Sequence, residues 1–390
     1  MIKGKDIICH AFPAWDGDYM KAVVQLMKAL AKHNRVLYVN YHYTLKDLLT
    51  AQLNKGAPKT GGIFNSKGYL EHKVQNAQGD LYLLNPPVVL PTNFIKNEWL
   101  YQAAQRQQAK RVGRAINLAI EELEFEEPIL INAFNPQFGL PLIDELNVAK
   151  TIYYCYDEIS AAEWSKAHGA DAEKEYLKKV DGVVVTSASL YHSKSQYNSN
   201  CHFVPNGVDH SLFSKALGIP RTGKKVIGYV SSVDNRIDYE LLRKVAMNNL
   251  GSTVRLIGRI RSDKAIGLAR QFPNIELTGA KQPNELADEV AKIDIGLIPF
   301  VTNEFTKNIY PLKVNEYLAA GKPVVSTAFA CLKEFNGVIA IEESHGGFIS
   351  AISRQLKSDH LKLQHLRSRW AKKNSWAQRA ELFSEVLEAC

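Results

Sequence analysis

The stretch Asp294–Ala328, DIGLIPFVTNEFTKNIYPLKVNEYLAAGKPVVSTA, contains the pattern that decides the fold. It begins with a short apolar run that ends at Pro299, and a polar loop follows. Pro311 then opens a helical pattern that ends at Gly321, and a second apolar run begins at Pro323. Proline in the first turn of a helix and glycine just after its end are the preferred residues at those positions. The stretch therefore predicts a strand, a helix and a second strand, which is the building unit of a parallel α/β sheet.

Short apolar runs of the same kind recur along the whole chain. They are rich in Val, Ile, Leu and Tyr with little polar alternation, which is typical of parallel strands covered on both faces. In the first half they are Asp6–His10, Val36–Asn40, Asp80–Leu84, Pro128–Asn132, Thr151–Tyr156, Gly182–Thr186 and His202–Val204. In the second half they are Lys225–Val230, Thr253–Ile257, Ile275–Leu277, Ile293–Pro299, Pro323–Ser326 and Gly337–Ile341.

Helical patterns lie between these runs. They are Tyr19–Lys32, Asn97–Leu123, Tyr239–Met247, Asn284–Lys292, Leu312–Ala320 and Gly347–Leu356, and Ser375 is placed to cap a last helix, Trp376–Leu387. Alternating strands and helices predict α/β architecture with two Rossmann-like domains, whose parallel sheets face a central cleft. The turn at Pro205-Asn206-Gly207 divides a first domain, 1–207, from a second, 208–370. We expect the C-terminal helix, about 371–390, to pack back on the first domain.

The composition is that of an ordinary soluble globular protein. Of 390 residues, 46% are hydrophobic and 23% are charged. No apolar run approaches the roughly 20 residues that a membrane span needs. The five cysteines are scattered without a CxxC pair, which predicts reduced thiols, no zinc site and a cytoplasmic location.

The net charge of +8 is concentrated in the second half of the chain. Residues 1–210 contain 22 Lys and Arg against 22 Asp and Glu, whereas residues 211–390 contain 26 against 18. A basic half is typical of proteins that meet an anion, although a solvated basic face without a partner gives the same count. We expect no nucleic-acid partner, because no basic run is interleaved with aromatic residues.

Several common catalytic motifs are missing from the sequence. It contains no GxxxxGK[ST], no GxGxxG after a first strand, no HExxH and no GxSxG, which argues against P-loop NTPases, simple dehydrogenases, zincins and α/β-hydrolases. The first strand–helix junction instead reads Pro13-Ala14-Trp15-Asp16-Gly17-Asp18-Tyr19. With one glycine and two carboxylates it is a poor phosphate cradle but suits a ligand rich in hydroxyl groups.

The helix that opens at Pro311 is a candidate anion site. Free N–H groups at a helix start attract anions, and Lys313 stands in the first turn, where a positive charge opposes the helix dipole unless an anion is bound. Glu316 lies three residues further on. The two side chains could equally form a simple i,i+3 ion pair, and these residues alone leave both interpretations open.

Two segments resemble the donor domain of glycosyltransferase family 4. They are Asp294–Ala328 and the PNGVD segment Phe203–Asp209, which is followed by Phe213. Further stretches are similar to a bacterial subgroup of that family that builds cell-surface polysaccharides of the teichuronic-acid kind: Tyr153–Glu158, Asp181–Ser187, Ile227–Ser232, Asn274–Gly279 and Asn374–Trp376. The resemblance covers about residues 150–380 and implies the two-domain GT-B fold.

The resemblance also implies a donor site. In this family two glutamates, with seven residues between them, frame the nucleotide sugar. The second matches Glu316, implying hydrogen bonds to the ribose hydroxyls, whereas the first falls at Asn308, an uncharged amide. The backbone of Tyr310, Pro311 and Leu312 falls where the family holds the diphosphate.

The loop after the first strand of the second domain completes the implied donor site. Arg236 is the nearest match to the family's basic residue there, although a solvated loop arginine is an equal alternative. Ser231 and Ser232, which end a matched stretch, are also expected to contact the donor.

The resemblance further implies a retaining, metal-independent transferase that uses a UDP- or GDP-sugar as donor substrate and no separate cofactor. The departing phosphate helps to deprotonate the acceptor hydroxyl in such enzymes, while positive charge stabilises it. Arg236 and Lys313 would supply that charge. A sugar-nucleotide epimerase and a non-catalytic nucleotide-sugar or glycan-binding protein are the alternatives.

The acceptor side is marked by two residues at strand ends. His10 and Asp157 each follow an apolar run, where residues of a ligand crevice belong. A glycan or lipid-linked acceptor is expected. The basic stripe Arg106, Lys110 and Arg114, with Arg111 beside it, either rests on the inner face of the plasma membrane or is a plain solvated face.

Overall fold

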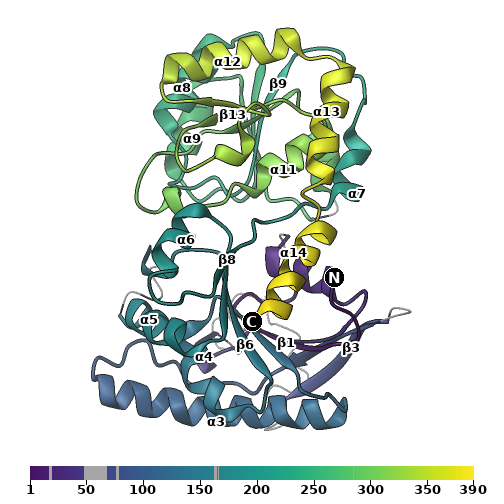
Figure 1. Ribbon diagram of the computed structural model, residues 1–390. Helices are drawn as coiled ribbons and strands as arrows, with labels where there is room; N and C mark the ends of the chain where they lie inside the picture. Colours follow the sequence, from purple (N-terminus) through teal and green to yellow (C-terminus); the bar gives the residue numbers. More distant parts are fainter. Residues whose placement is uncertain (17–19, 48–67, 76–78, 162–164, 166, 284) are drawn as a thin grey trace. The chain divides into compact units, whose positions relative to one another are not determined.

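The computed structural model describes residues 1–16, 20–47, 68–75, 79–161, 165, 167–283 and 285–390. Tyr19 and Asn284, each at the start of a predicted helix, lie outside the described residues, as do Gly17 and Asp18. The chain forms two compact units (Figure 1). Of the described residues, the first contains those within 1–16, 21–205 and 380–390, and the second contains Met20 and those within Asn206–Arg379.

The first unit is built on an eight-stranded sheet with the order β3-β4-β2-β1-β5-β6-β7-β8. All neighbours are parallel except β3 and β4. The strands are β1 Asp6–Ala11, β2 Arg35–Val39, β3 Tyr69–Gln75, β4 Asp80–Asn85, β5 Ile129–Ala133, β6 Lys150–Cys155, β7 Gly182–Val185 and β8 Cys201–Phe203. β3 has no counterpart among the predicted strands, because this edge strand contains the polar run Glu71-His72-Lys73 instead of a buried apolar run.

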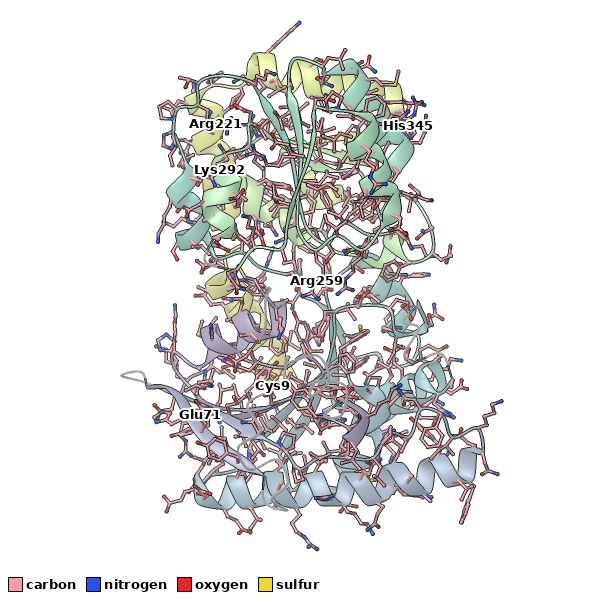
Figure 2. The ribbon with its side chains drawn as sticks, turned by 180° about the vertical axis from the view of Figure 1, so that it is seen from behind. Cys9, Glu71, Arg221, Arg259, Lys292 and His345 are labelled. Carbon is pink, nitrogen blue, oxygen red and sulfur yellow. The ribbon has the colours of Figure 1, made fainter. Side chains whose placement is uncertain are left out.

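Helices cover this sheet, and apolar side chains fill the space between. They are α1 Ala22–Leu30, α3 Glu98–Glu122, α4 Pro136–Leu142, α5 Gly169–Lys179 and α6 Ala188–Lys194. Val112 and Ile116 of α3 pack with Ile8 and Leu37 in one cluster, and Figure 2 shows the side chains that fill the unit, including Cys9 of β1. Burial raises the pKa of the Cys9 thiol far above its ordinary range, so this cysteine is inert.

The second unit repeats the arrangement with a six-stranded sheet in the order β11-β10-β9-β12-β13-β14. Its strands are β9 Val226–Val230, β10 Thr253–Ile257, β11 Ile275–Gly279, β12 Ile295–Ile298, β13 Val324–Thr327 and β14 Ala340–Glu342. Its helices are α7 His210–Phe213, α8 Tyr239–Asn248, α9 Asp263–Gln271, α10 Leu286–Ala291, α11 Leu312–Ala319, α12 His345–Ser358 and α13 Leu361–Lys372. Every pairing in this sheet is parallel, and the predicted α/β fold class is confirmed.

Two glycines of the central strands allow close packing on the second sheet: Gly296 leaves room for the Tyr317 ring of α11, and Gly228 leaves room for Ile293, just before β12. A Cβ atom at Gly296 of β12 would lie 2.4 Å from the ring of Tyr317, and one at Gly228 of β9 would lie 2.2 Å from Ile293. The Tyr317 hydroxyl accepts a hydrogen bond of 2.8 Å from the backbone N–H of Val230. α11 ends as predicted at Gly321, whose φ of +75° and hydrogen bond to Leu318 form a Schellman motif with the bond from Lys322 to Tyr317.

The last helix, α14 Trp376–Ala389, begins in the second unit and ends in the first. Ser375 caps it through a hydrogen bond from the Gln378 N–H, as the sequence predicts. Phe383 packs edge-on against Tyr154 of β6, and the Leu387 carbonyl accepts a hydrogen bond from Lys150. Within the described residues, the structure contains no helix with the length and apolar character that crossing a membrane requires.

Replacing Gly296 with Ala tests the close packing of α11 on β12. The added Cβ would meet the buried Tyr317 ring, so we expect a loss of about 1–3 kcal/mol in the free energy of unfolding. Gly267→Ala in α9 is the matched control, because nothing lies within 4 Å of its Cβ, and it should stabilise by up to about 1 kcal/mol. Urea unfolding measures both. Equal effects of the two substitutions would contradict this packing.

Candidate functional site

The second sheet has a switch point between β9 and β12. The chain leaves β9 toward β10 on one side, whereas β12 leads to β13 on the other. Ligands of open α/β sheets bind outside the carboxyl ends of strands at such a point. Here the loops after β9 and β12 lie side by side: the Val301 N–H donates to the Arg236 carbonyl and the Asp238 N–H to the Pro299 carbonyl, both at 2.8 Å.

The loop after β9 carries three of the predicted donor residues, Ser231, Ser232 and Arg236. The Ser231 N–H donates to the Ile257 carbonyl, and the Ser232 carbonyl accepts a hydrogen bond of 2.9 Å from the Tyr229 hydroxyl. These bonds fix the backbone of both serines at the carboxyl end of the central strand.

Arg236 is held by a carboxylate and an aromatic ring. Its Nε and Nη2 atoms lie 2.8 and 2.7 Å from the two carboxylate oxygens of Asp234. Its guanidinium lies 5.5 Å from the centre of the Phe300 ring. A bidentate ion pair and a cation–π contact together restrict the guanidinium to one orientation at the switch point.

The loop after β12 is compact and internally bonded. The Thr306 hydroxyl donates to the Val301 carbonyl at 2.6 Å. Asn308, where the family has its first glutamate, is buried, and its amide donates to the Glu304 carbonyl at 2.9 Å. One of its two amide N–H groups is therefore bonded within the loop.

The backbone at Tyr310-Pro311-Leu312 differs from an open cradle of N–H groups. Pro311 has no N–H, and its φ of −79° and ψ of 79° make an inverse γ-turn, in which the Leu312 N–H donates to the Tyr310 carbonyl at 2.9 Å. The Tyr310 side chain is buried, where its hydroxyl accepts a bond from Asn315, and burial raises its pKa. The Leu312 N–H is thus already used inside the turn.

Lys313 and Glu316 form the i,i+3 ion pair that the sequence leaves open as an alternative. The Lys313 ammonium lies 2.9 and 2.7 Å from the two carboxylate oxygens of Glu316. Glu316 is 6% exposed, so a buried carboxylate and its cation stand together at the start of α11. The pair is compatible with a donor site, because the ammonium can bind an anion and the carboxylate can accept hydrogen bonds from hydroxyl groups.

The first sheet has its own switch point, between β1 and β5, and His10 lies there. His10 is fully buried, stacked on His42 with ring centres 5.8 Å apart. Among the described residues neither ring nitrogen of His10 has a hydrogen-bond partner. Burial, and then the neighbouring His42, lowers the pKa of His10 to about 3, so its imidazole is neutral.

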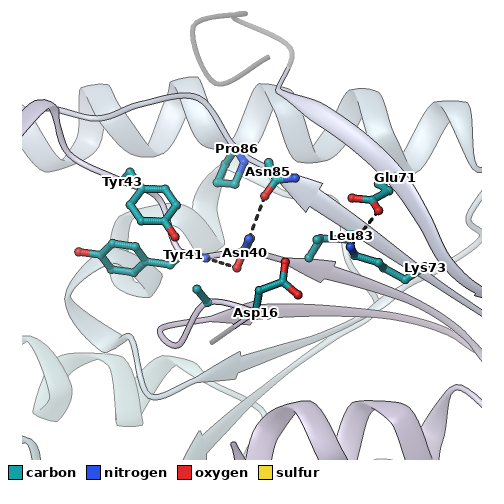
Figure 3. Close-up of a pocket in the computed structure, with 10 residues that line it drawn as sticks. Asp16, Asn40, Tyr41, Tyr43, Glu71, Lys73, Leu83, Asn85 and Pro86 are labelled. Carbon is teal, nitrogen blue, oxygen red and sulfur yellow. Dashed lines mark hydrogen bonds and ion pairs between the residues drawn. The ribbon is translucent and has the colours of Figure 1, made fainter. Parts of the chain in front are cut away.

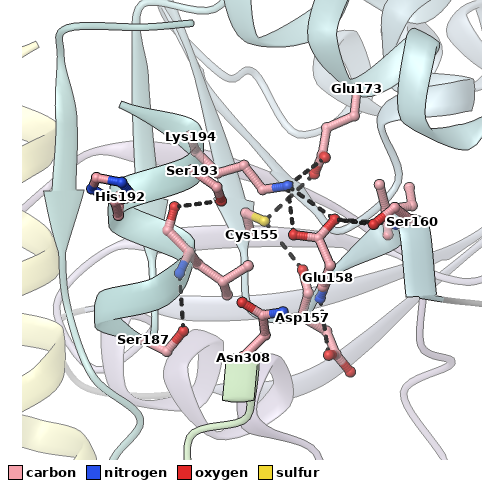
Figure 4. A network of polar contacts seen from close by, with 12 residues as sticks. Cys155, Asp157, Glu158, Ser160, Glu173, Ser187, His192, Ser193, Lys194 and Asn308 are labelled. Carbon is pink, nitrogen blue, oxygen red and sulfur yellow. Dashed lines mark hydrogen bonds and ion pairs between the residues drawn. The ribbon is translucent and has the colours of Figure 1, made fainter. Parts of the chain in front are cut away.

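Asp157 and Glu158 follow β6, and Glu158 belongs to a buried ionic network (Figure 4). The Lys194 ammonium lies 3.0 Å from Glu158 and 2.7 Å from Glu173, whose carboxylate also accepts a bond of 2.8 Å from the Tyr153 hydroxyl. Burial works to lower the pKa of Lys194, but the two carboxylates raise it. The Glu158 N–H donates to Asp157 at 2.9 Å, so the network fixes the turn that presents Asp157.

A cavity of about 260 Å³ opens at the carboxyl ends of β1, β2 and β4 (Figure 3). Asn40 forms its base: the side-chain oxygen accepts from the Trp15 N–H at 2.7 Å, and the amide donates to Asn85 at 2.8 Å. Asp16 and the rings of Tyr41 and Tyr43 complete one wall. Amides, a carboxylate and tyrosine side chains suit a ligand rich in hydroxyl groups.

Some of these residues have no counterpart among the sequence candidates. Asn40 and Asn85 each stand at the end of a strand. The same position in the sequence pattern identified His10 as a candidate, so it could also have identified these two asparagines. Lys194 is separated from Glu158 by 36 residues, and no spacing rule connects them. Arg259 also lies at the carboxyl end of the second sheet, where its carbonyl accepts from the Val233 N–H.

Comparisons with known proteins agree with this architecture. Residues 224–358, which include β9 to β14 and all of α12, match the family described as Glycosyl transferases group 1. TuaH of Bacillus subtilis (strain 168), named for glycosyltransfer in teichuronic acid biosynthesis, is 26% identical over 211 residues. That match covers 48% of this chain and 53% of TuaH, so it spans about half the length of the relative.

Solved structures with the same fold match the chain over its whole length. A sucrose-phosphate synthase from Thermosynechococcus elongatus has a TM-score of 0.69 at 15% identity, with 100% of both chains covered. An E. coli trehalose-6-phosphate structure bound with UDP-2-fluoro glucose has a TM-score of 0.68 at 11% identity, with 98% of this chain and 99% of that chain covered. These likenesses show the fold, and the predicted GT-B fold is confirmed.

Removing the cation at the centre of the network tests its structural role. Lys194→Met leaves Glu173 buried without its counter-charge, so we expect a loss of about 3–5 kcal/mol in the free energy of unfolding. Lys178→Met is the control, because its ion pair with Glu175 is exposed, and its effect should stay within about 0.5 kcal/mol. Chemical denaturation followed by circular dichroism measures both. A Lys194→Met protein as stable as the control would rule out a stabilising network.

Proposed function

We propose that this chain, a GT-B protein whose second unit is a group 1, family 4-like glycosyltransferase domain, transfers a sugar from a nucleotide-diphosphate donor to a glycan or lipid-linked acceptor in surface polysaccharide biosynthesis. One observation carries the proposal: the loop that carries Arg236 is hydrogen-bonded to the loop after β12, and that second loop leads into α11, whose first turns carry the Lys313–Glu316 pair. That arrangement offers two cations for a diphosphate and a buried carboxylate for hydroxyl groups. The match of this unit to the group 1 family supports the same conclusion.

The proposed donor is a UDP- or GDP-sugar. The E. coli structure of similar fold contains UDP-2-fluoro glucose, which supports a uridine nucleotide. Glu316 would accept hydrogen bonds from the ribose hydroxyls, while Ser231, Ser232 and the backbone from Tyr310 to Leu312 surround the diphosphate. Because Asn308 carries no charge, it would contact the sugar hydroxyls as an amide, so sugar preference should differ from that of members with glutamate there.

The proposed reaction retains the configuration at the anomeric carbon and uses no metal. The bond from the anomeric carbon to the leaving phosphate oxygen breaks, and the acceptor oxygen bonds to the same face of the sugar. The acceptor proton passes to the departing phosphate, and the nucleoside diphosphate leaves with it. Arg236 and Lys313 would stabilise the charge that develops on the leaving group, which is where electrostatic catalysis acts.

On the acceptor side, Asp157 is better placed than His10. Asp157 is partly exposed on a turn that the Lys194 network holds, whereas His10 is fully buried. We propose that Asp157 contacts the acceptor hydroxyl and that His10 shapes the crevice from behind. The cavity based on Asn40 would hold a sugar residue of the acceptor. A cytoplasmic protein at the inner face of the plasma membrane fits such an acceptor.

A screen of nucleotide sugars tests the proposal. Wild-type protein should show a thermal shift and slow hydrolysis with a UDP- or GDP-sugar, and Glu316→Ala should weaken nucleotide binding by about 1–3 kcal/mol, because the ribose hydroxyls lose their acceptor. Glu276→Ala, which removes an ion-paired carboxylate of edge strand β11, is the control and should bind normally. No response to any nucleotide sugar, with no turnover on supplied acceptors, would eliminate the transferase.

Arg236→Ala separates catalysis from binding. If the guanidinium stabilises the leaving diphosphate, kcat should fall by about 100-fold or more while donor affinity changes less. Arg243→Ala is the matched control, because Arg243 makes a similar pair with Glu240 on α8 and should leave both constants unchanged. Steady-state kinetics and nucleotide titration supply the two numbers. A variant that binds donor normally and turns over at the wild-type rate would remove Arg236 from the mechanism.

Donor binding without hydrolysis or transfer, even by the wild type, would favour the binding-protein alternative.

A further inference from the structure

A cluster of large apolar side chains is exposed where the chain enters α3. Leu90 is 60% exposed, Phe94 74%, Trp99 70% and Leu100 50%. All four lie within eleven residues of sequence. Single exposed apolar residues are normal, but four large ones on one short segment indicate an interaction surface.

The surrounding structure fixes this segment in place. The Leu90 N–H donates to the Gln108 side chain, and Asn97 caps α3 by accepting from the Leu100 N–H. His168, at the start of α5, stacks on Tyr101 with ring centres 3.7 Å apart and lies 3.0 Å from the Ile95 carbonyl. Because the backbone is tied at both ends, Phe94 and Trp99 are presented outward.

Cations continue the same surface along α3. Arg106 and Lys110 lie seven and eleven residues after Trp99, which places them within about 20° of it around the helix. Arg111 and Arg114 follow on the same open side, and all four side chains are exposed. Residues 90–114 contain five cations and one acidic residue, whereas residues 115–127 contain five acidic residues and no cation.

We propose that the surface of residues 90–114 docks on an anionic lipid bilayer. Aromatic and aliphatic side chains beside a row of Lys and Arg are the chemistry that inserts at a bilayer interface and holds acidic headgroups. The acidic end of α3 would be repelled, so the N-terminal end of the helix faces the lipid. The inference rests on the proposed function in one respect: a lipid-linked acceptor is the reason for the protein to contact the bilayer.

Vesicle co-sedimentation of the full chain tests the proposal. Wild-type protein should bind vesicles of phosphatidylcholine with phosphatidylglycerol and bind phosphatidylcholine alone weakly. Phe94→Ser combined with Trp99→Ser should reduce binding by about tenfold or more, because the inserted apolar area is lost. Leu250→Ser is the matched control, because Leu250 is 69% exposed in the second unit, and it should bind as the wild type does.

Charge is tested separately. Arg106→Gln with Lys110→Gln should weaken binding to the anionic vesicles by about fivefold per cation, whereas Lys357→Gln with Lys362→Gln, exposed cations of the second unit, should change nothing. Absence of wild-type binding, or equal losses with the control variants, would overturn the proposal. The proposal would also be overturned if light scattering showed a wild-type dimer that became a monomer in the Phe94 and Trp99 variant, since the surface would then join two copies of the chain. Nucleotide titration in the same samples reports on the proposed function alone, so either claim can fail without the other.

Discussion

The hydrogen bond from the Val230 N–H to the buried Tyr317 hydroxyl is the interaction on which the proposed donor site depends. It joins α11, which carries Lys313 and Glu316, to the end of the central strand β9, from which the loop of Arg236 departs. The bond is possible only because Gly296 leaves room for the Tyr317 ring. Leaving the buried Val230 N–H without this acceptor would cost about 1–3 kcal/mol. The packing of α11 on the sheet and the position of the charged groups therefore depend on the same contact.

Each cation of the proposed donor site has a carboxylate as its partner, whereas the buried cation of the first unit has two. Lys313 is matched by Glu316 and Arg236 by Asp234, and in the first unit Lys194 is matched by Glu173 and Glu158. Lys313, Arg236 and Asp234 are partly exposed, so each of the first two pairs can exchange a partner for a ligand. The third is buried and serves to hold a turn in place. The Leu312 N–H is already bonded within the γ-turn, so positive side chains carry more of the proposed diphosphate binding than the backbone does.

Much of this fold could be predicted from the sequence, because buried parallel strands are continuous apolar runs and helices such as α11 carry proline and glycine at their ends. Thr253–Ile257 was predicted residue for residue, and Asn97 and Ser375 cap the expected helices. The edge strand β3 was missed because an edge tolerates polar residues. In the site, the Lys313–Glu316 pair follows from helix spacing. The stacked His10 and the Lys194 network depend on contacts between distant segments, which periodicity does not encode. The γ-turn at Pro311 is local, but proline fixes only φ, and the turn depends on ψ as well.

Hydrogen exchange of backbone amides, with and without a bound UDP- or GDP-sugar, tests the central claim most directly. If the donor occupies the switch point of the second sheet, protection should increase in residues 231–238 and 308–316 and in few other segments of that unit. Val230 and its neighbours in β9 should be protected in both states, because the Tyr317 hydroxyl already holds them. Protection confined to the first unit, or increases in the second unit that avoid both loops, would contradict the assignment of the donor site.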